Sequence, residues 1–306
     1  MFSLQDATAV PIVDLGTASS FAILAGSNIT DAGGATVIAA GDVGLSPASG
    51  AFIGLTTAQV LNGTIYSVDA AGPAGSSINP GLLTNAKNDL TTAYNDAAGR
   101  TGTTLGGVYD LGGDSLFSGV YDATSAFFLT GTLELDAQND PDAVWIFQSA
   151  STLITASNST VVFKDGIGSA CNVFWQVGSS ATIGTGTSFI GNIMADQSIA
   201  LQTGATVVGS ALARIGGVTL DHNTITQDDC HAGGDGDGDG DGDGDGDGDG
   251  DGDGDGDGDG DGDGDGDGGG GGGGHSVPDS GSTLPLLGCG VAMLLGLKRR
   301  FLTRAC

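Results

Sequence analysis

Short apolar alternations separated by glycine, serine or asparagine recur along residues 150–226 of the chain. Residues 182–191 and 200–209 superpose residue for residue at a period of 18, and another copy begins at Thr219, 19 residues further on. Each copy holds three such alternations, which predict three short strands joined by tight turns. Three strands in so few residues describe one triangular coil of a β-solenoid.

Two further copies extend the pattern toward the N-terminus. One begins at Thr152 and is displaced by an insertion around residues 164–170, and a degenerate copy covers residues 28–38. Stacked coils are stable only together, because each buries its apolar side chains against its neighbours. We expect one inward ladder to consist of Leu153, Ile183, Leu201 and Leu220.

One segment departs from the strand pattern and predicts a helix over about residues 80–98. Asn79 can cap it, Pro80 occupies its first turn, and Gly99 follows its end. Apolar residues recur between these signals at the 3.6-residue helical period. The side of the solenoid is the large surface against which this apolar stripe is expected to pack.

Five segments carry a family resemblance. They are residues 13–26 (VDLGTASSFAILAG), 41–47 (GDVGLSP), 93–100 (AYNDAAGR), 144–148 (VWIFQ) and 173–177 (VFWQV). In this order they resemble the ice-binding-like family, typed by microbial ice-binding proteins of the DUF3494 class, across about residues 13–228. The resemblance implies an all-β fold, a right-handed discontinuous β-solenoid (triangular β-helix), with one long α-helix packed alongside.

The resemblance also implies a function, which is adsorption to ice through a flat, threonine-rich face. Stacked strands repeat at about 4.7–4.9 Å, comparable to the short repeat of ice, and threonine offers a hydroxyl and a methyl group with restricted χ1. Three turns come close to the Thr-Ala/Gly-X-Thr/Asn motif of active members. We expect the ice-binding residues to be Thr155, Asn158, Thr185, Ser188, Thr203 and Thr206. The copy at residues 221–224 departs furthest, with His222 in place of threonine.

Other readings of the front part stay open. Threonine and glycine also occur at solenoid corners for turn and strand preferences alone. A cell-surface adhesin or an exopolysaccharide-binding structural protein could share this fold without ice activity. An enzyme is disfavoured, because Asp136, Asp140 and Asp142 have no basic residue close in sequence and read as a turn. No cofactor is expected.

Charge is distributed unevenly along the chain, whose formal net charge is −29. Residues 1–232, the expected solenoid domain, carry 19 acidic against 4 basic side chains, so nucleic acid is excluded as a partner. Residues 233–276 form an expected disordered linker, with an unbroken Asp-Gly alternation over residues 235–268. Calcium loops are not expected there, because the closing glutamate is missing.

Residues 277–306 are predicted to be a sorting signal. Val277, Pro278, Asp279, Ser280 and Gly281 precede an uncharged run over residues 284–297 and a basic cluster at residues 298–300. This arrangement resembles the VPDSG type of bacterial C-terminal signal, a relative of the PEP-CTERM class. The resemblance implies transient membrane insertion and cleavage by an exosortase-like protease, and hence a protein that is secreted or held at the cell surface.

Cysteine usage agrees with export. Cys171 and Cys230 are the possible pair in the front part, while Cys289 and Cys306 lie in the tail. Without CxxC spacing a disulfide is favoured over a metal site, and the same two positions resemble a pair found in many bacterial family members. Residues 1–11 lack the regions of a signal peptide, so we expect the true start codon to lie upstream.

Overall fold

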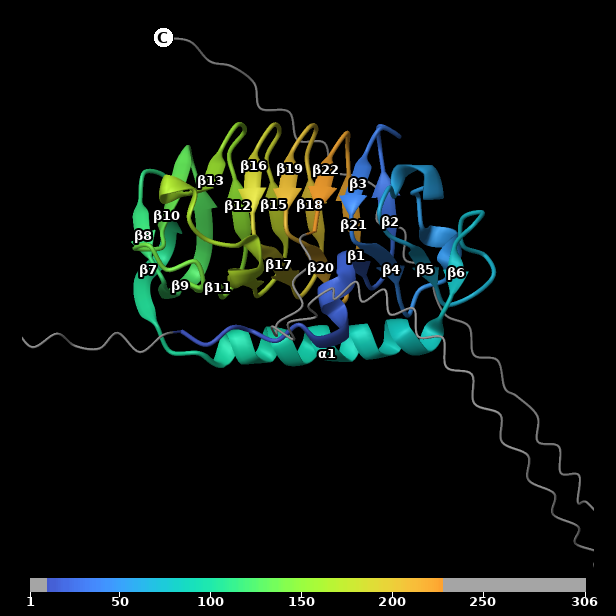
Figure 1. Cartoon of the computed structure of the whole chain (residues 1–306), viewed down its shortest axis with the longest axis horizontal. Coiled ribbons are helices and arrows are strands. Elements are labelled where there is room, and N and C mark those ends of the chain that lie inside the picture. The colour runs from blue at the N-terminus through green and yellow to red at the C-terminus, as the bar shows by residue number, and fades with distance from the viewer. Residues whose placement is uncertain (1–9, 228–306) are drawn as a thin grey trace, which may run out of the picture. The chain divides into compact units, whose positions relative to one another are not determined.

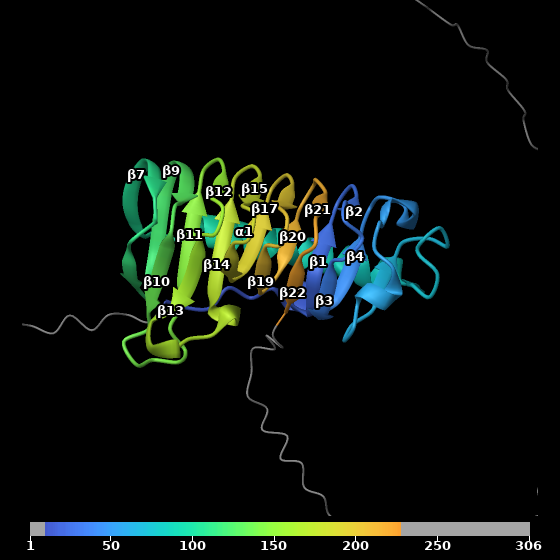
Figure 2. The same ribbon diagram turned by 90° about the horizontal axis from the view of Figure 1, so that it is seen from above.

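The fold is a three-sided β-solenoid with one helix along its side (Figures 1 and 2). A computed structural model of the chain describes residues 10–227, which lie within one compact unit. All strand pairs in this part of the chain are parallel, as stacked coils require. The expected all-β solenoid with a helix alongside is confirmed. The expected boundaries at residues 232 and 276 lie outside the described residues.

Strands of successive coils stack into three faces. Face 1 consists of β11 (Trp145–Ser149), β14 (Val173–Val177), β17 (Asn192–Ala195), β20 (Ala211–Ala213), β1 (Phe21–Ala25), β4 (Asp42–Leu45), β5 (Ile65–Ser67) and β6 (Ser77–Ile78). Face 2 consists of β12 (Leu153–Thr155), β15 (Ala181–Ile183), β18 (Ile199–Leu201), β21 (Val218–Leu220) and β2 (Ile29–Asp31). Face 3 consists of β8 (Ser115–Phe117), β10 (Thr132–Asp136), β13 (Thr160–Phe163), β16 (Ser188–Ile190), β19 (Thr206–Val208), β22 (Thr224–Thr226) and β3 (Val37–Ala40).

Two longer strands close one end of the solenoid. The strand β9 (Gly119–Leu129) bends from face 1, where it pairs with β11, to face 2, where it pairs with β12. The strand β7 (Thr103–Asp110) pairs with β9. Short 3-10 helices occupy several connections, namely η1 (Gly16–Ser20), η2 (Gly50–Phe52), η3 (Thr57–Gln59), η4 (Lys164–Gly166) and η5 (Ala170–Asn172).

The order of the coils in space differs from their order in the sequence. The N-terminal strand β1 pairs with β20 on one side and with β4 on the other. Likewise β2 and β3 pair with β21 and β22 of the last coil. The blue N-terminal coil therefore lies beside the orange C-terminal coil in Figure 1. The discontinuous order implied by the family resemblance is confirmed.

Large apolar side chains fill the interior of the coils. The rings of Phe147 and Trp175 stack with centroids 4.1 Å apart, and Phe189 lies 5.0 Å from Trp175. The indole Nε1 of Trp175 donates to the carbonyl of Ile190 at 3.0 Å, so its polar atom is satisfied. Interdigitated, fully buried rings of this kind resist deformation, which keeps the faces of the solenoid rigid.

The predicted helix is confirmed as α1 (Pro80–Gly99), one residue longer than expected. The Asn79 side chain accepts a hydrogen bond from the Leu82 amide at 3.0 Å and caps its start. Its apolar stripe packs on face 1 and covers that face. The buried helical residues are Leu83, Ala86, Leu90, Ala93, Tyr94 and Ala97, and they meet Ile146, Phe174, Met194, Leu212 and Leu24.

A lysine attaches the middle of the helix to the end of β20. The Lys87 ammonium donates to the carbonyls of Ala213 at 2.7 Å and Arg214 at 2.6 Å. Burial, and then the neighbouring Arg214 guanidinium, lower the pKa of Lys87 to about 8. Arg214 in turn pairs with Asp196 at 2.6 Å and lies over the Tyr94 ring.

Within residues 10–227 no helix is both long and apolar enough to cross a membrane.

The predicted inward ladder is correct in three of its four members. Ile183 and Leu201 are paired, and Leu220 continues their row one coil further on. Leu153 is also buried, but it pairs with Ala181 rather than lying in the row of Ile183. Thr155 occupies the place expected for Leu153. The reason is the insertion, which makes the offset between this coil and the next 28 residues, as the pairing of Thr160 with Ser188 shows.

Candidate functional site

The outward surface of face 3 carries one hydroxyl side chain per strand in continuous register. Thr132, Thr160, Ser188, Thr206 and Thr224 follow one another across β10, β13, β16, β19 and β22, and we call them the hydroxyl row. Four of the five are exposed, and Thr160 is partly exposed. The row ends at Val37 on β3. The alternation of the strands directs the intervening residues, such as Phe189, into the core.

A second row lies two residues further along the same strands. It consists of Val162, Ile190 and Val208, with Thr226 after them, and we call it the aliphatic row. Val162 and Val208 are 38% and 39% exposed, so the branched side chains stand at the surface rather than in the core. Face 3 therefore presents a line of hydroxyl-bearing side chains and, parallel to it, a line of mainly aliphatic side chains.

A third row lies in the turns between face 2 and face 3. The register of Thr160 with Ser188 places Ser157 beside Thr185, and Thr203 lies one coil further on. All three are exposed, and we call them the corner row. The turns are hydrogen-bonded to one another through the backbone, since the Asn158 amide donates to the Thr185 carbonyl at 2.8 Å and the Gly186 amide to the Thr203 carbonyl at 3.0 Å.

The second residue of each turn has a left-handed backbone. Asn158, Gly186 and Gly204 have φ of 59°, 65° and 70°. Glycine and asparagine tolerate this conformation better than other residues, which explains why they occupy this position of the repeat. His222 adopts it too, at φ 54°, at the end of the corner row.

Five of the six predicted binding residues are exposed on this surface. Ser188 and Thr206 belong to the hydroxyl row, and Thr185 and Thr203 belong to the corner row. Asn158 is exposed at the left-handed position of its turn, where it aligns with Gly186 instead of with Ser188.

The expectation that Thr155 belongs to an exposed ladder is wrong. Its side chain is buried, with 3% exposure. Its hydroxyl accepts a hydrogen bond from the Gly184 amide at 2.8 Å and lies 3.2 Å from the Thr187 hydroxyl. The motif aligns residues 155–158 with residues 185–188, whereas the strands pair with an offset two residues shorter. Thr155 is therefore a core residue of the corner.

Sequence reasoning missed the aliphatic row and four members of the other two rows, namely Thr132, Ser157, Thr160 and Thr224. The alternation of apolar and polar residues around Ile154 could have indicated the correct register. Ile154 pairs with Thr182, and this pairing sets the 28-residue offset. Thr224 lies in the copy that departs furthest from the motif, with His222 in place of threonine, although its strand register with Thr206 is regular.

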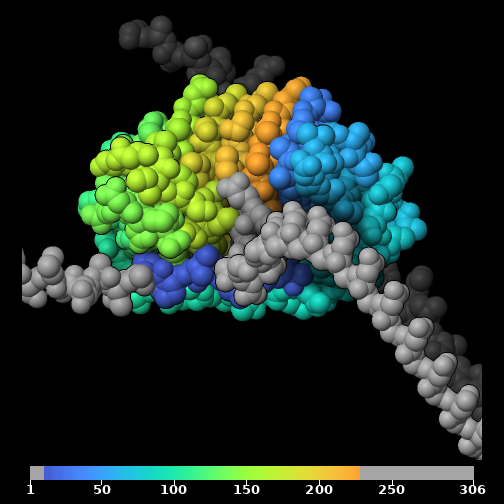
Figure 3. Space-filling view, viewed as in Figure 1, coloured from blue at the N-terminus to red at the C-terminus, as the bar shows by residue number. Residues whose placement is uncertain are grey.

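Charged side chains mark both ends of the three rows. On β10 the position of the aliphatic row is taken by Glu134, and Lys164 pairs with Asp136 at 2.7 Å and with Glu134 at 3.9 Å. At the other end Asp221 accepts from the Thr203 hydroxyl and contacts His222 at 2.6 Å, and these two contacts hold its pKa below its ordinary value. In Figure 3 the yellow and orange strands form an even strip between a yellow-green and a blue projection.

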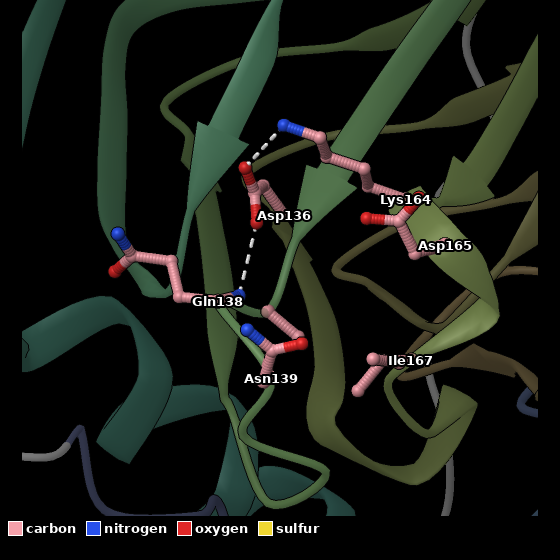
Figure 4. A pocket seen from close by; sticks show the side chains of 7 residues that line it. Asp136, Gln138, Asn139, Lys164, Asp165 and Ile167 are labelled. Atoms are coloured by element: carbon pink, nitrogen blue, oxygen red, sulfur yellow. Dashed lines mark hydrogen bonds and ion pairs between the residues drawn. The ribbon is translucent and has the colours of Figure 1, made fainter.

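A hollow of about 430 Å³ lies beside Lys164 and is lined by Asp136, Gln138 and Asn139 (Figure 4). Lys164 supplies the basic partner of Asp136 that is distant in sequence, and hydrogen bonds from Lys164 and the Gln138 amide lower the pKa of Asp136. The Lys164 ammonium and the Asp136 carboxylate neutralise each other's charge. Asp140 accepts from the Asp142 amide at 3.0 Å, the turn expected from the sequence.

The remaining predicted sites lie at the margin of the described residues. Cys171 is disulfide-bonded, whereas its predicted partner Cys230 lies outside residues 10–227, so the pairing itself stays a prediction. The five residues Val277, Pro278, Asp279, Ser280 and Gly281 also lie outside them. In the part of the chain that the structure covers, no group of histidine, cysteine and acidic residues is arranged to hold a metal ion.

Known ice-binding proteins are similar to this chain in sequence and in structure. An ice-binding protein of Nostoc sp. (strain HG1) is 44% identical over 223 residues, 72% of this chain and 76% of the relative. One from Colwellia sp. is 41% identical and covers 70% of this chain and 83% of the relative. A crystal structure of an ice-binding protein from an Antarctic biological consortium superposes with a TM-score of 0.64 at 41% identity, covering 74% of this chain and 95% of that one.

Two family descriptions match the chain itself. The VPDSG-CTERM motif matches residues 276–301, which confirms the resemblance noted at the C-terminus. The ice-binding-like family matches residues 23–226, the span from β1 to β22 that builds all three faces. With this match and with relatives as similar as the Nostoc protein, the chain belongs to the ice-binding-like family.

Proposed function

We propose that the protein binds ice through the outward surface of face 3 between β13 and β22, together with the corner row, and that it is not an enzyme. The single observation that carries this proposal is the register of Thr160, Ser188, Thr206 and Thr224 on adjacent parallel strands. Register fixes the spacing of these side chains at about 4.7–4.9 Å across strands and about 6.6 Å between rows along a strand. A periodic solid surface is matched by such a fixed two-dimensional repeat.

The chemistry of the rows suits bound water. Hydroxyl groups hold water molecules by hydrogen bonds, while the methyl groups of threonine, valine and isoleucine leave adjacent water bonded only to other water. Between β13 and β22 neither surface row includes a charged side chain. A strongly hydrated ion there would compete with an ordered water layer. Lys164 and Asp221 lie at the margins, where they bound the usable area.

Rigidity supports the same proposal, because ordering a flexible surface on binding costs entropy. Threonine and valine have few χ1 rotamers, so their positions are largely fixed before binding. Beneath the rows, Phe189 and Val207 are fully buried and pack in the core. Most of the entropy cost of aligning the face is therefore met during folding.

We also propose an exported location for this activity. The support is the C-terminal sorting motif that matches residues 276–301. In this proposal the motif directs transient membrane insertion and cleavage by an exosortase-like protease. The disulfide of Cys171 agrees with an oxidising compartment. The soluble or surface-bound product would then meet ice outside the cell.

The test is the effect of the purified full chain on ice. We expect shaped crystals, thermal hysteresis and inhibition of recrystallisation at micromolar concentration. Crystals that grow unshaped at high micromolar concentration would overturn the proposal. In that case binding to exopolysaccharide in a pull-down assay would favour the adhesin instead.

A further inference from the structure

We propose that three buried polar side chains, Ser159, Thr187 and Asn223, are positioning residues that hold the turns of the corner row in register for ice. This inference rests on the proposed function of face 3. All three lie in the turns between face 2 and face 3, directly before a member of the hydroxyl row. Their exposure is 0–1%, so none of them can touch ice.

Each of the three side chains links its own turn to the backbone of the preceding coil. The Ser159 hydroxyl donates to the Leu129 carbonyl at 2.8 Å. The Thr187 hydroxyl donates to the Ala156 carbonyl at 3.0 Å. The Asn223 amide donates to two carbonyls, those of Gln202 at 2.8 Å and Ala205 at 3.0 Å. The bonds repeat along the stack as the surface rows do.

The network continues on both sides of these bonds. On one side, the buried Thr155 hydroxyl lies between the Thr187 hydroxyl and the Gly184 amide and contacts both. On the other side, the backbone N–H of Asn223 donates to the Thr36 hydroxyl at 3.2 Å. Ala205 occupies the equivalent position in the turn at Thr203 and has no polar side chain. There the turns at Thr185 and Thr203 are joined by backbone bonds.

The inward anchor determines where the exposed neighbours point. In the turn at residues 185–188, Thr185 and Ser188 are exposed, Gly186 is left-handed and Thr187 is buried. A turn with a left-handed glycine has wide conformational freedom, which the bond from Thr187 to the Ala156 carbonyl removes. A loose turn would move Thr185 and Ser188 out of line with their counterparts on adjacent coils, and a binding site must be held to a fraction of an ångström.

The test compares Thr187→Val, which removes the hydroxyl but keeps the shape, with Thr187→Ser, which keeps a hydroxyl. We expect Thr187→Val to raise the protein concentration needed to inhibit recrystallisation by about fivefold, or about 1 kcal/mol at tenfold per 1.4 kcal/mol. Thr187→Ser should restore most of the activity. Amide hydrogen exchange at Gly184 and Gly186 should accelerate in Thr187→Val alone, independently of ice.

Ile225→Val is the matched control, because Ile225 is fully buried on β22 and makes no turn bond. It should lower Tm while leaving ice activity unchanged. All variants are assayed near the freezing point of the buffer, and circular dichroism verifies that each is folded. If Thr187→Val does not fold, Ser159→Ala replaces it. Wild-type activity in Thr187→Val or in its replacement, with unchanged exchange, overturns the positioning role. An inactive wild-type protein overturns the proposed function, and the positioning role with it.

Discussion

Thr206 lies within the hydroxyl row, between Ser188 of β16 and Thr224 of β22. A Thr206→Tyr substitution places an aromatic ring that projects beyond both neighbours. Tyrosine is well accepted on an exposed strand, and substitutions of this kind usually change stability by no more than about 0.5 kcal/mol. Thr203 is the less suitable position, because its hydroxyl donates to Asp221 and its loss would also disturb the turn.

The expected loss follows from the contacts that the ring separates from ice. If Ser188, Thr206 and Thr224 each contribute a net hydrogen bond of about 0.5–1.5 kcal/mol, losing all three costs about 1.5–4.5 kcal/mol. At tenfold per 1.4 kcal/mol, this lowers the binding constant by about tenfold to about a thousandfold. Dispersion contacts disappear at the same time, since a gap of about 1 Å already forfeits up to half of the attraction.

The assay is thermal hysteresis as a function of protein concentration, with urea unfolding as the measure of stability. The control is Asn85→Tyr on α1, where Asn85 is exposed on the helix that covers face 1. Thr91 is a poorer choice, because it is partly buried and its hydroxyl donates to the Lys87 carbonyl at 2.9 Å. Asn85→Tyr should keep full activity.

Two results would refute the assignment of face 3. Full activity in Thr206→Tyr would show that ice meets another face. Equal loss in both variants would show that a bulky residue acts through solubility or folding rather than through the hydroxyl row.

Other substitutions test the core, the helix and the disulfide. Phe189→Ala should reduce the free energy of unfolding by about 3–5 kcal/mol, measured by urea denaturation, because Phe189 is fully buried against Trp175. Lys87 has a folded pKa of about 8, below its ordinary value of 10.5, so the unfolded chain binds more protons between these values and stability should rise with pH there, by about 1–3 kcal/mol. In Lys87→Met this rise should be absent, and a rise of equal size in both proteins would contradict the reasoning. Thiol counting should find Cys171 and Cys230 unreactive until reduction, and closure of their loop of about 60 residues should stabilise by about 4 kcal/mol. Two reactive thiols from these positions would exclude the pairing.

The sequence alone predicted the fold well because the solenoid repeats its own signals. The helix was found from Asn79, Pro80 and Gly99, three local signals that act within one turn of its ends. The 18-residue period between residues 182–191 and 200–209 set the register of β15 with β18 and of β16 with β19 correctly. Repetition makes strand register readable, which it is not for an isolated strand.

The candidate site was predicted less well where the period is interrupted. Between Thr160 and Ser188 the offset is 28 residues, and no repeat remained to show how the insertion is divided among the coils. Thr155 and Asn158 were therefore aligned by their residue types, whereas the alternation of buried and exposed positions decides the pairing. The inward hydrogen bonds of Thr155 could not be foreseen, because a buried hydroxyl and an exposed one look alike in sequence.

The last coil, from β20 to β22, joins two parts of the solenoid that are otherwise connected by α1. Strands β9 to β19 lie on one side of it, and β1 to β6 lie on the other. A nascent chain that has reached residue 209 cannot yet close this junction, so the complete fold forms only after residue 226 is available. Contacts between residues so distant in sequence slow folding. The same arrangement leaves no free edge on the last coil, because β20, β21 and β22 each pair with a strand on both sides.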